Sequence, residues 1–398
     1  MSSERMRIVL KELNEIAKTD KKRVKIARAP GRANLIGEHT DYNEGYVLPC
    51  TVDRDIIMAA APVHDEVVLH SINFNSTRRF SLTDIKFDPQ DHWGNYPKGV
   101  TDHLLLSGHE IDGMTGVIHS TIPIGAGLGS SAALEVVTGL MFKLLYDVEI
   151  SPVDLALTCF KAENEFVGVS CGIMDQFASV LGRQDAFLFL DCRTLGNELV
   201  SLPSQKMRVV LLNTMVDRTA AAILNKRELE CRKAIKIIRR FRPKIKALRD
   251  LSSDDFQELK NRLPPTLRKR CQHVVYENER VLEMVEALKK DDQSLVGKLM
   301  GASHTSCRDL YEVSCRELDI MVEMAEKISG VIGCRMTGAG FGGCAVCLVW
   351  EWALEELTKS VCVEYPKRTG IKPEIYVCTI PPGAEDMLNR NERIEEVF

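Results

Sequence analysis

The chain has 398 residues, which is longer than a single hydrophobic core usually grows, so we expect two domains. Hydrophobic residues make up 45% of it and charged residues 27%, a mixture that favours a globular protein and excludes a disordered or fibrous one. The formal net charge of −4 gives no electrostatic reason to expect binding to nucleic acid.

The first half of the chain alternates short strand patterns with helical periodicity. We predict strands over 24–29, 46–49, 56–61, 67–70, 114–120, 186–190 and 208–212. A helix is expected around 96–107, an apolar-faced helix follows a glycine-rich loop over 130–145, and Ser151-Pro152 opens a third. This pattern is typical of an α+β or α/β fold.

The second half is dominated by helices from about residue 219 to 329 and then closes with a short sheet. Strands are predicted over 333–337, 344–349 and 374–379, with a helix over 353–364 between the last two. We therefore predict a second α+β domain and place the boundary near residue 205, which gives domains 1–205 and 206–398. The basic stretch 226–249 carries eleven Lys or Arg residues, but Ala234, Ile238 and Phe241 recur at helical spacing, which favours a solvated helix with a buried stripe.

Export and membrane insertion are not expected. Residues 1–20 are charged throughout and lack the apolar region of a secretory signal, and apolar runs such as 344–350 are far shorter than the roughly 20 residues that span a bilayer. The thirteen cysteines are scattered through apolar runs, which favours reduced thiols in a cytoplasmic enzyme. Cys344 and Cys347 form a CxxC, but residues three apart on a strand face opposite sides, so we expect packing and not a metal site.

A glycine-rich loop over 123–133, PIGAGLGSSAA, lies between a predicted strand and a predicted helix. Its glycines let the backbone approach an anion, and the N–H groups and dipole of the helix stabilise phosphate charge. No lysine follows the last glycine, so it is not a Walker A loop. We predict a polyphosphate site here, and a tight structural turn is the alternative.

A second glycine cluster over 337–343, TGAGFGG, contains the spacing GxGxxG. A dinucleotide site needs a helix directly afterwards, whereas the next residues are short, apolar and strand-like. This context argues against an oxidoreductase. We expect the cluster to pack against the first glycine loop or its ligand.

Charged residues crowd into the segment 29–43, APGRANLIGEHTDYN. Glu38, His39 and Asp41 fall within four residues, with Arg32 six residues upstream. Such a cluster suits a polyhydroxylated ligand, because each hydroxyl both donates and accepts hydrogen bonds; a charged surface turn is the alternative. Further along, CGIMDQF over 171–177 places Asp175 where it could take a proton from an attacking hydroxyl or orient it.

In this order, the four segments resemble those of the galactokinase branch of the GHMP kinases, a family that also includes homoserine, mevalonate and phosphomevalonate kinases. GRANLIGEHTDYNEG resembles the galactokinase signature, PIGAGLGSSAA the phosphate loop and TGAGFGG the third family motif, and the match runs from about residue 25 to 380. The resemblance implies an α+β, two-domain GHMP kinase fold. Its N-terminal domain would be ribosomal-protein-S5-like α/β and its C-terminal domain ferredoxin-like α+β, with the active site in the cleft between them.

The resemblance also implies ATP- and Mg²⁺-dependent phosphorylation of the anomeric hydroxyl of galactose by a monomer or weak oligomer. Asp175 would be the base or electrostatic partner of that hydroxyl, with Arg32 beside it. Matching family positions assign the sugar hydroxyls to Glu38, His39, Asp41 and the backbone near Gly172. They assign ATP to Gly125, Gly127, Leu128, Gly129, Ser130, Ser131 and, near the adenine, Trp93, and they assign Mg²⁺ to Ser131 and Glu163.

Two positions depart from the galactokinase pattern. Gly129 stands where these enzymes usually carry serine, and Leu224 stands where they usually carry a sugar-contacting tyrosine. Losing that phenol could redirect specificity toward galacturonate, arabinose or N-acetylgalactosamine. A non-catalytic sugar sensor is a further alternative, but Ser130, Ser131 and Ala132 of the phosphate loop are all present.

Overall fold

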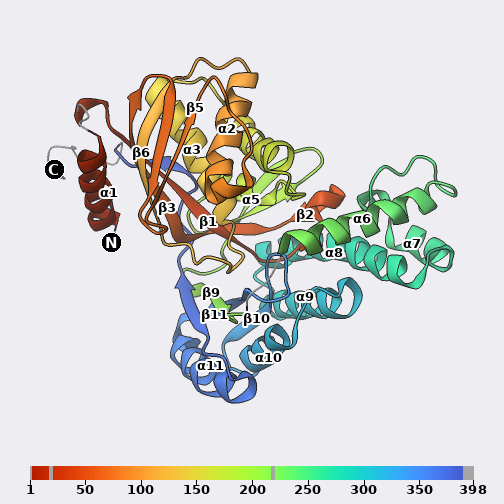
Figure 1. Cartoon of the computed structure of the whole chain (residues 1–398). Helices are drawn as coiled ribbons and strands as arrows, with labels where there is room; N and C mark the ends of the chain where they lie inside the picture. Colours follow the sequence, from red (N-terminus) through yellow and green to blue (C-terminus); the bar gives the residue numbers. More distant parts are fainter. Residues whose placement is uncertain (1, 18–20, 217–219, 389–398) are drawn as a thin grey trace.

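The computed structural model describes residues 2–17, 21–216 and 220–388. Figure 1 shows an upper lobe built on strands from the first half of the chain, a lower lobe built on β9, β10 and β11, and helices α6, α7 and α8 extending to one side. Helices and strands are both abundant, which confirms the predicted α+β character. None of the described helices has the length and apolarity to cross a membrane.

The upper lobe contains a six-stranded sheet in the order β13-β1-β3-β6-β4-β5, in which only the β4–β6 pair is parallel. Its strands are β1 (Lys25–Asn34), β3 (Pro49–Val63), β4 (Glu66–Ser71), β5 (Ser76–Ser81), β6 (Gly113–Ser120) and β13 (Glu385–Asp386). The register of β1 against β3 shifts between Pro30 and Arg32. Such an irregularity re-aims the side chains that follow it, and Arg32 is one of them.

Helices cover both faces of this sheet. On one face α1 (Ser2–Ile16) buries Val9 and Leu13 against Ile26 and Ile57. On the other face lie α2 (Asn95–Leu106), α3 (Ser130–Tyr146), α4 (Pro152–Lys161) and α5 (Met174–Leu181). The alternation of β1 residues between the two cores follows the two-residue period of a strand. A small sheet of β2 (Tyr46–Val47), β7 (Ala186–Asp191) and β8 (Asn197–Ser201) lies beside them.

The lower lobe contains a four-stranded antiparallel sheet in the order β10-β11-β9-β12. Its strands are β9 (Met207–Asn213), β10 (Val331–Met336), β11 (Cys344–Trp350) and β12 (Glu374–Cys378). The α-helices described in this half are α6 (Ala220–Ile238), α7 (Ser253–Leu259), α8 (Pro265–Lys289), α9 (Gln293–Ser306), α10 (Arg316–Ala325) and α11 (Leu354–Thr369). Cys344 and Cys347 belong to different cores, one on each face of β11, as predicted.

Short helical turns join these elements. They are η1 (Lys21–Arg23), η2 (Asp41–Asn43), η3 (Pro89–Gly94), η5 (Leu248–Asp250), η6 (Lys260–Arg262) and η8 (Glu351–Ala353), together with the π-helical turns η4 (Ala162–Val167) and η7 (Cys307–Tyr311). Both π-turns follow directly on an α-helix, and such turns are frequent at functional sites.

Several predicted elements differ in extent from those observed. The predicted strand 24–29 continues as β1 to Asn34, and strands β5, β8 and β13 were not foreseen. Residue 219, the predicted start of the helical region, lies outside the described residues. The buried stripe of the basic stretch holds for Ala234 and Ile238, but Phe241 lies beyond the end of α6 and is 43% exposed. Strand β13 lies in the second half of the chain but pairs with β1 in the sheet of the upper lobe. A single boundary near residue 205 therefore does not separate the two lobes completely, and it stays a prediction.

Candidate active site

A cavity of about 320 Å³ brings the sequence motifs together. Of the site residues predicted from the sequence, thirteen line it: Arg32, Glu38, His39, Asp41, Gly125, Gly127, Leu128, Gly129, Ser130, Ser131, Glu163, Gly172 and Asp175. Leu224, Gly338 and Ala339 also line it, so segments more than 300 residues apart in the sequence share one site. Trp93 is not among the lining residues.

Arg32 and Asp175 form a two-pronged ion pair inside this cavity. Arg32 Nε donates to Asp175 Oδ1 at 2.7 Å and Nη2 donates to Oδ2 at 2.6 Å, while Nη1 donates to the Gly127 carbonyl at 2.5 Å. Burial lowers the pKa of the guanidinium, but the attraction of Asp175 outweighs it and raises that pKa above its usual value. The geometry fixes the Asp175 carboxylate beside the phosphate loop.

The glycine loop adopts a backbone that other residues rarely adopt. Gly125, Gly127 and Gly129 have φ angles of 75°, 76° and 71°, in the left-handed region that glycine enters without strain. Helix α3 begins at the next residue, Ser130, so its first N–H groups lie at the cavity. Gly338 packs on this loop, because a Cβ atom there would lie 3.0 Å from the Gly127 carbonyl oxygen. The predicted packing of the two glycine clusters is thereby confirmed.

Glu38 connects the first motif to the lower lobe. Its Oε1 accepts hydrogen bonds from Thr337 Oγ1 at 3.1 Å and from the Gly338 N–H at 2.5 Å. Its Oε2 accepts from Arg335 Nη1 at 2.7 Å and from the Asn34 amide. Glu38 and Arg335 are fully buried, so this ion pair across the two lobes is shielded from water. Sequence reasoning missed Arg335, whose only signal is a lone charge within the apolar strand β10.

His39 presents an unused nitrogen atom at the site. Its Nδ1 pairs with the Tyr42 hydroxyl at 2.9 Å, and that hydroxyl pairs with the Tyr311 hydroxyl at 2.8 Å. Its Nε2 is buried and has no hydrogen-bond partner among the residues that the structure describes. Burial and the nearby charges of His273 and Arg227 lower the pKa of His39 well below 6.5, so the ring is neutral. A neutral imidazole nitrogen left unpaired suits a ligand hydroxyl.

Asp41 lies against Gly172. A Cβ atom on Gly172 would fall 2.0 Å from Asp41 Oδ2, so the absence of a side chain there makes room for the carboxylate. Burial, together with the negative charge of Asp175, raises the pKa of Asp41 to about 7. Asp41 therefore titrates near neutral pH.

Glu163 and Ser131 offer oxygen atoms to a cation. Glu163 lies in the π-turn η4, lines the cavity and shares a hydrogen bond with the Ser131 hydroxyl. A carboxylate and a hydroxyl are hard oxygen ligands of the kind that Mg²⁺ prefers. The donor set therefore fits Mg²⁺, with the phosphate loop beside it.

Trp93 packs away from the cavity lining. Its ring stacks on Phe74 with centroids 6.4 Å apart, and its Nε1 donates to Ser76 Oγ at 3.2 Å. An adenine contact at Trp93 stays a prediction.

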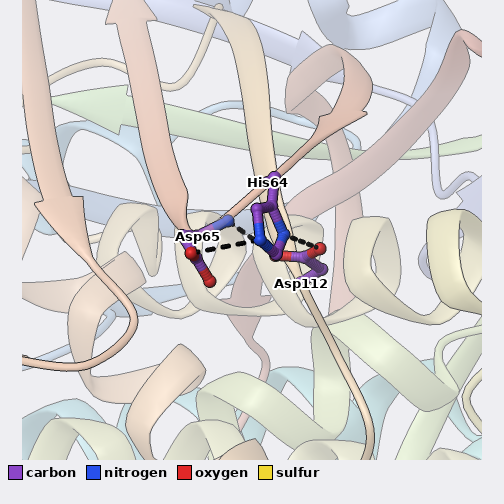
Figure 2. A group of neighbouring side chains, drawn as sticks. All are labelled: His64, Asp65 and Asp112. Atoms are coloured by element: carbon purple, nitrogen blue, oxygen red, sulfur yellow. Dashed lines mark hydrogen bonds and ion pairs between the residues drawn. The ribbon is translucent and has the colours of Figure 1, made fainter.

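Figure 2 shows a cluster of His64, Asp65 and Asp112. None of these three residues lines the cavity. His64 Nδ1 pairs with Asp112 at 2.8 Å and Nε2 pairs with Asp65 at 3.2 Å, so both ring nitrogens already face carboxylates. The hydrogen bond to Asp112 raises the pKa of His64, which favours the protonated ring. Because both ring nitrogens already pair with carboxylates at the surface, we interpret the cluster as an exposed ion-pair group.

Comparison with known proteins identifies three matching family models. They are the galactokinase galactose-binding signature over residues 15–62, the GHMP kinase N-terminal domain over 95–183 and the GHMP kinase C-terminal domain over 284–358. The chain is 42% identical to a galactokinase of Clostridium acetobutylicum, covering 90% of this chain and 93% of that protein. It is also 42% identical to a galactokinase of a Roseiflexus species, and that match covers 93% of this chain and 95% of that protein.

Solved structures agree with these matches. The crystal structure of Lactococcus lactis galactokinase complexed with galactose is 36% identical, with a TM-score of 0.91 over 95% of this chain and 98% of that one. The mevalonate kinase of Methanococcus jannaschii, at 20% identity and a TM-score of 0.63 over 89% and 98%, shares the fold. The predicted two-domain GHMP kinase fold is thereby confirmed.

Proposed function

Because the chain belongs to the galactokinase family of GHMP kinases, we propose that it transfers the γ-phosphoryl group of ATP to the anomeric hydroxyl of galactose. The observation that carries the proposal is the ion pair of Arg32 and Asp175, held between the phosphate loop and a group of hydroxyl-binding side chains. The predicted cytoplasmic location and monomeric or weakly oligomeric state remain predictions.

The roles of the two ion-paired residues follow from their place in the cavity. As the anomeric oxygen forms a bond to the γ-phosphorus, the bond from that phosphorus to the bridging oxygen of ADP breaks. Asp175 accepts or orients the departing proton of the sugar hydroxyl. The neighbouring guanidinium of Arg32 offsets negative charge on the transferring group. A loose transition state demands little of a base, so positioning is the larger part of this task.

The loop from Gly125 to Ser131 would bind the phosphates of ATP through backbone N–H groups and the start of α3. Ser131 and Glu163 would hold Mg²⁺, which supplies neutralisation of phosphate charge when bound. The pairing of hydroxyl with carboxylate keeps these two side chains together in the structure.

Sugar hydroxyls would be recognised by His39 and Asp41. His39 contributes a neutral, unpaired Nε2, and Asp41 contributes a carboxylate beside Gly172. Four protein donors already occupy the two oxygens of Glu38, so Glu38 would act mainly by holding the third motif beside the sugar. Leu224 lies in the cavity wall, where a tyrosine would present a hydroxyl.

The test of the substrate is ADP release measured with galactose, galacturonate, arabinose, glucose and N-acetylgalactosamine under identical ATP and Mg²⁺ concentrations. We expect galactose to give the highest kcat/KM. A higher value for another sugar would keep the kinase chemistry and overturn galactose, and the wall at Leu224 would then be the first place to look for the cause. No ADP release above the sugar-free rate with any of them would favour a non-catalytic sensor.

Replacing Gly172 with alanine should impair sugar binding selectively. The new Cβ would overlap the Asp41 carboxylate, which must move, and displacements of about 1 Å at a binding group can reduce rates up to about 100-fold. We expect the KM for galactose to rise at least about tenfold while the KM for ATP stays within about threefold. Gly301→Ala is the matched control, because its Cβ would meet nothing closer than 3.4 Å. Equal effects of the two variants would contradict the assigned role of Gly172.

Galactose affinity should increase with pH through neutrality. The pKa of Asp41 is raised to about 7, so the carboxylate is mostly protonated at pH 6 and mostly ionised at pH 8. An ionised carboxylate accepts stronger hydrogen bonds from hydroxyls, so affinity should rise as the proton is lost. Titration calorimetry without ATP should show up to about a tenfold gain over this range, the ratio of ionised fractions. The Asp41→Asn variant should lose this dependence, and an unchanged slope would assign it to another group.

A further inference from the structure

Gln176 lies directly behind the proposed metal-binding residues. It follows Asp175 on helix α5, is fully buried and does not line the cavity. Its amide Nε2 donates to Glu163 Oε2 at 2.7 Å and to Glu135 Oε2 at 2.9 Å. An amide group has two N–H donors, and here each of them is given to a different carboxyl group.

The bonds on Glu163 distinguish its two oxygen atoms. Oε2 accepts from Gln176 and also faces Cys171 Sγ at 3.3 Å, and neither of these contacts involves Oε1. Oε2 is thus held from the protein side, which leaves Oε1 as the oxygen free of these two donors. A carboxylate fixed through one oxygen can present the other to a cation in a single orientation.

We propose that Gln176 is a positioning residue that orients the Glu163 carboxylate for the divalent cation accompanying ATP, with Glu135 as the anchor of its amide. This assignment rests on the proposed function, because it concerns the cation of that same site. Asp175 and Gln176 are consecutive residues at the start of α5, so one helix turn would position both the group beside the reacting hydroxyl and the group behind the cation ligand.

The contacts around the amide argue against a purely structural role. If Gln176 served only to satisfy buried polar groups, its own oxygen and that of Glu135 should be paired as well. Instead, Gln176 Oε1 and Glu135 Oε1 are buried without a hydrogen-bond partner in the part of the chain that the structure describes. The amide is oriented so that its donors reach the two carboxyl groups while two acceptors stay unpaired, an arrangement that favours the position of Glu163 over full satisfaction.

The experiment compares the single variant Glu135→Met with the double variant Glu135→Met, Gln176→Met. Removing Gln176 alone would leave the buried Glu135 carboxyl group without its amide partner, and the Glu135→Met background avoids this. The readout is Mn²⁺ binding to the enzyme with a non-hydrolysable ATP analogue, followed by the loss of the free Mn²⁺ signal in electron paramagnetic resonance. Ser179→Ala is the control. Ser179 lies on α5, as Gln176 does, and the substitution removes a buried hydrogen bond from its hydroxyl to the Pro30 carbonyl of β1. The Mg²⁺ dependence of kcat and the KM for galactose are measured in parallel.

We expect Ser179→Ala to bind Mn²⁺ within about threefold of the unaltered enzyme, and the double variant to bind it about 10- to 100-fold more weakly. Glu135→Met should fall between them, because the Gln176 amide loses its anchor but keeps its bond to Glu163. The double variant should also need more Mg²⁺ for half-maximal kcat, while its KM for galactose stays unchanged. Unchanged Mn²⁺ binding by the double variant would overturn the role of Gln176 and leave the proposed cation site intact. Failure of the unaltered enzyme to bind Mn²⁺ with the analogue would overturn the proposed cation site itself and this assignment with it.

Discussion

Replacing Asp175 with asparagine should reduce kcat by about 10²- to 10⁴-fold, the range that a positioned acid or base contributes. The asparagine amide keeps the size of the side chain but cannot accept a proton. It also lacks the negative charge that pairs with Nε and Nη2 of Arg32. Steady-state ADP release with saturating ATP and galactose measures the loss. Galactose binding, followed by calorimetry, should persist, because the role proposed for Asp175 concerns the reacting hydroxyl.

Asp41→Asn is the matched comparison, since it makes the same chemical change in the same cavity. Its effect should appear mainly in the KM for galactose, because Asp41 is assigned to sugar recognition. Near-normal kcat in Asp175→Asn, or the same pattern of effects in both variants, would contradict the role of Asp175.

Replacing Arg335 with methionine should destabilise the protein by about 3–5 kcal/mol, the usual consequence of removing one partner from a buried ion pair. Both side chains are shielded from water, so Glu38 would be left as an uncompensated charge in the core. The free energy of unfolding, measured by denaturant titration, should fall by that amount. Sugar affinity should weaken as well, because Glu38 holds Thr337 and Gly338 of the third motif in place.

The double variant Arg335→Met, Glu38→Gln tests the cause of that loss. With the Glu38 charge removed, part of the stability should return, whereas two independent losses would simply add. A decrease of less than 1 kcal/mol in Arg335→Met would show that the pair contributes no more than an exposed one.

The parts of the site that the sequence predicts are those whose chemistry is local. The loop glycines are recognisable because a phosphate cradle needs their left-handed backbone, and Glu38, His39 and Asp41 are recognisable because they crowd into four residues. The structure brings these residues into one cavity.

The missed residues act through contacts that are distant in sequence. Arg335 meets Glu38 across 297 residues, and Tyr311 meets Tyr42 across 269, so neither is marked by a local pattern. Gln176 is adjacent to Asp175, yet its partner Glu135 lies 41 residues away, and a lone glutamine carries no signal of its own. Gly172 was predicted as a backbone contact for the sugar, whereas the structure gives it a second task, which is to leave space for Asp41.

The fold shows the same division. The predicted first strand ends at residue 29, whereas β1 continues through Pro30 and Gly31 with a shift in register. Proline and glycine usually weaken or interrupt a strand, so the continuation carries no local signal. Gly31 is needed there, since a Cβ atom would lie 2.7 Å from the Leu128 carbonyl oxygen of the phosphate loop. The feature that breaks the strand pattern is therefore the feature that places Arg32 beside the loop.

Phosphoryl transfer to the anomeric hydroxyl of galactose is tested by identifying the product. After incubation with ATP, Mg²⁺ and galactose, ³¹P nuclear magnetic resonance should show a new phosphate monoester coupled to the anomeric proton, in an amount equal to the ADP formed. A monoester coupled to the protons of another carbon, or ADP with no sugar phosphate, would exclude transfer to the anomeric hydroxyl.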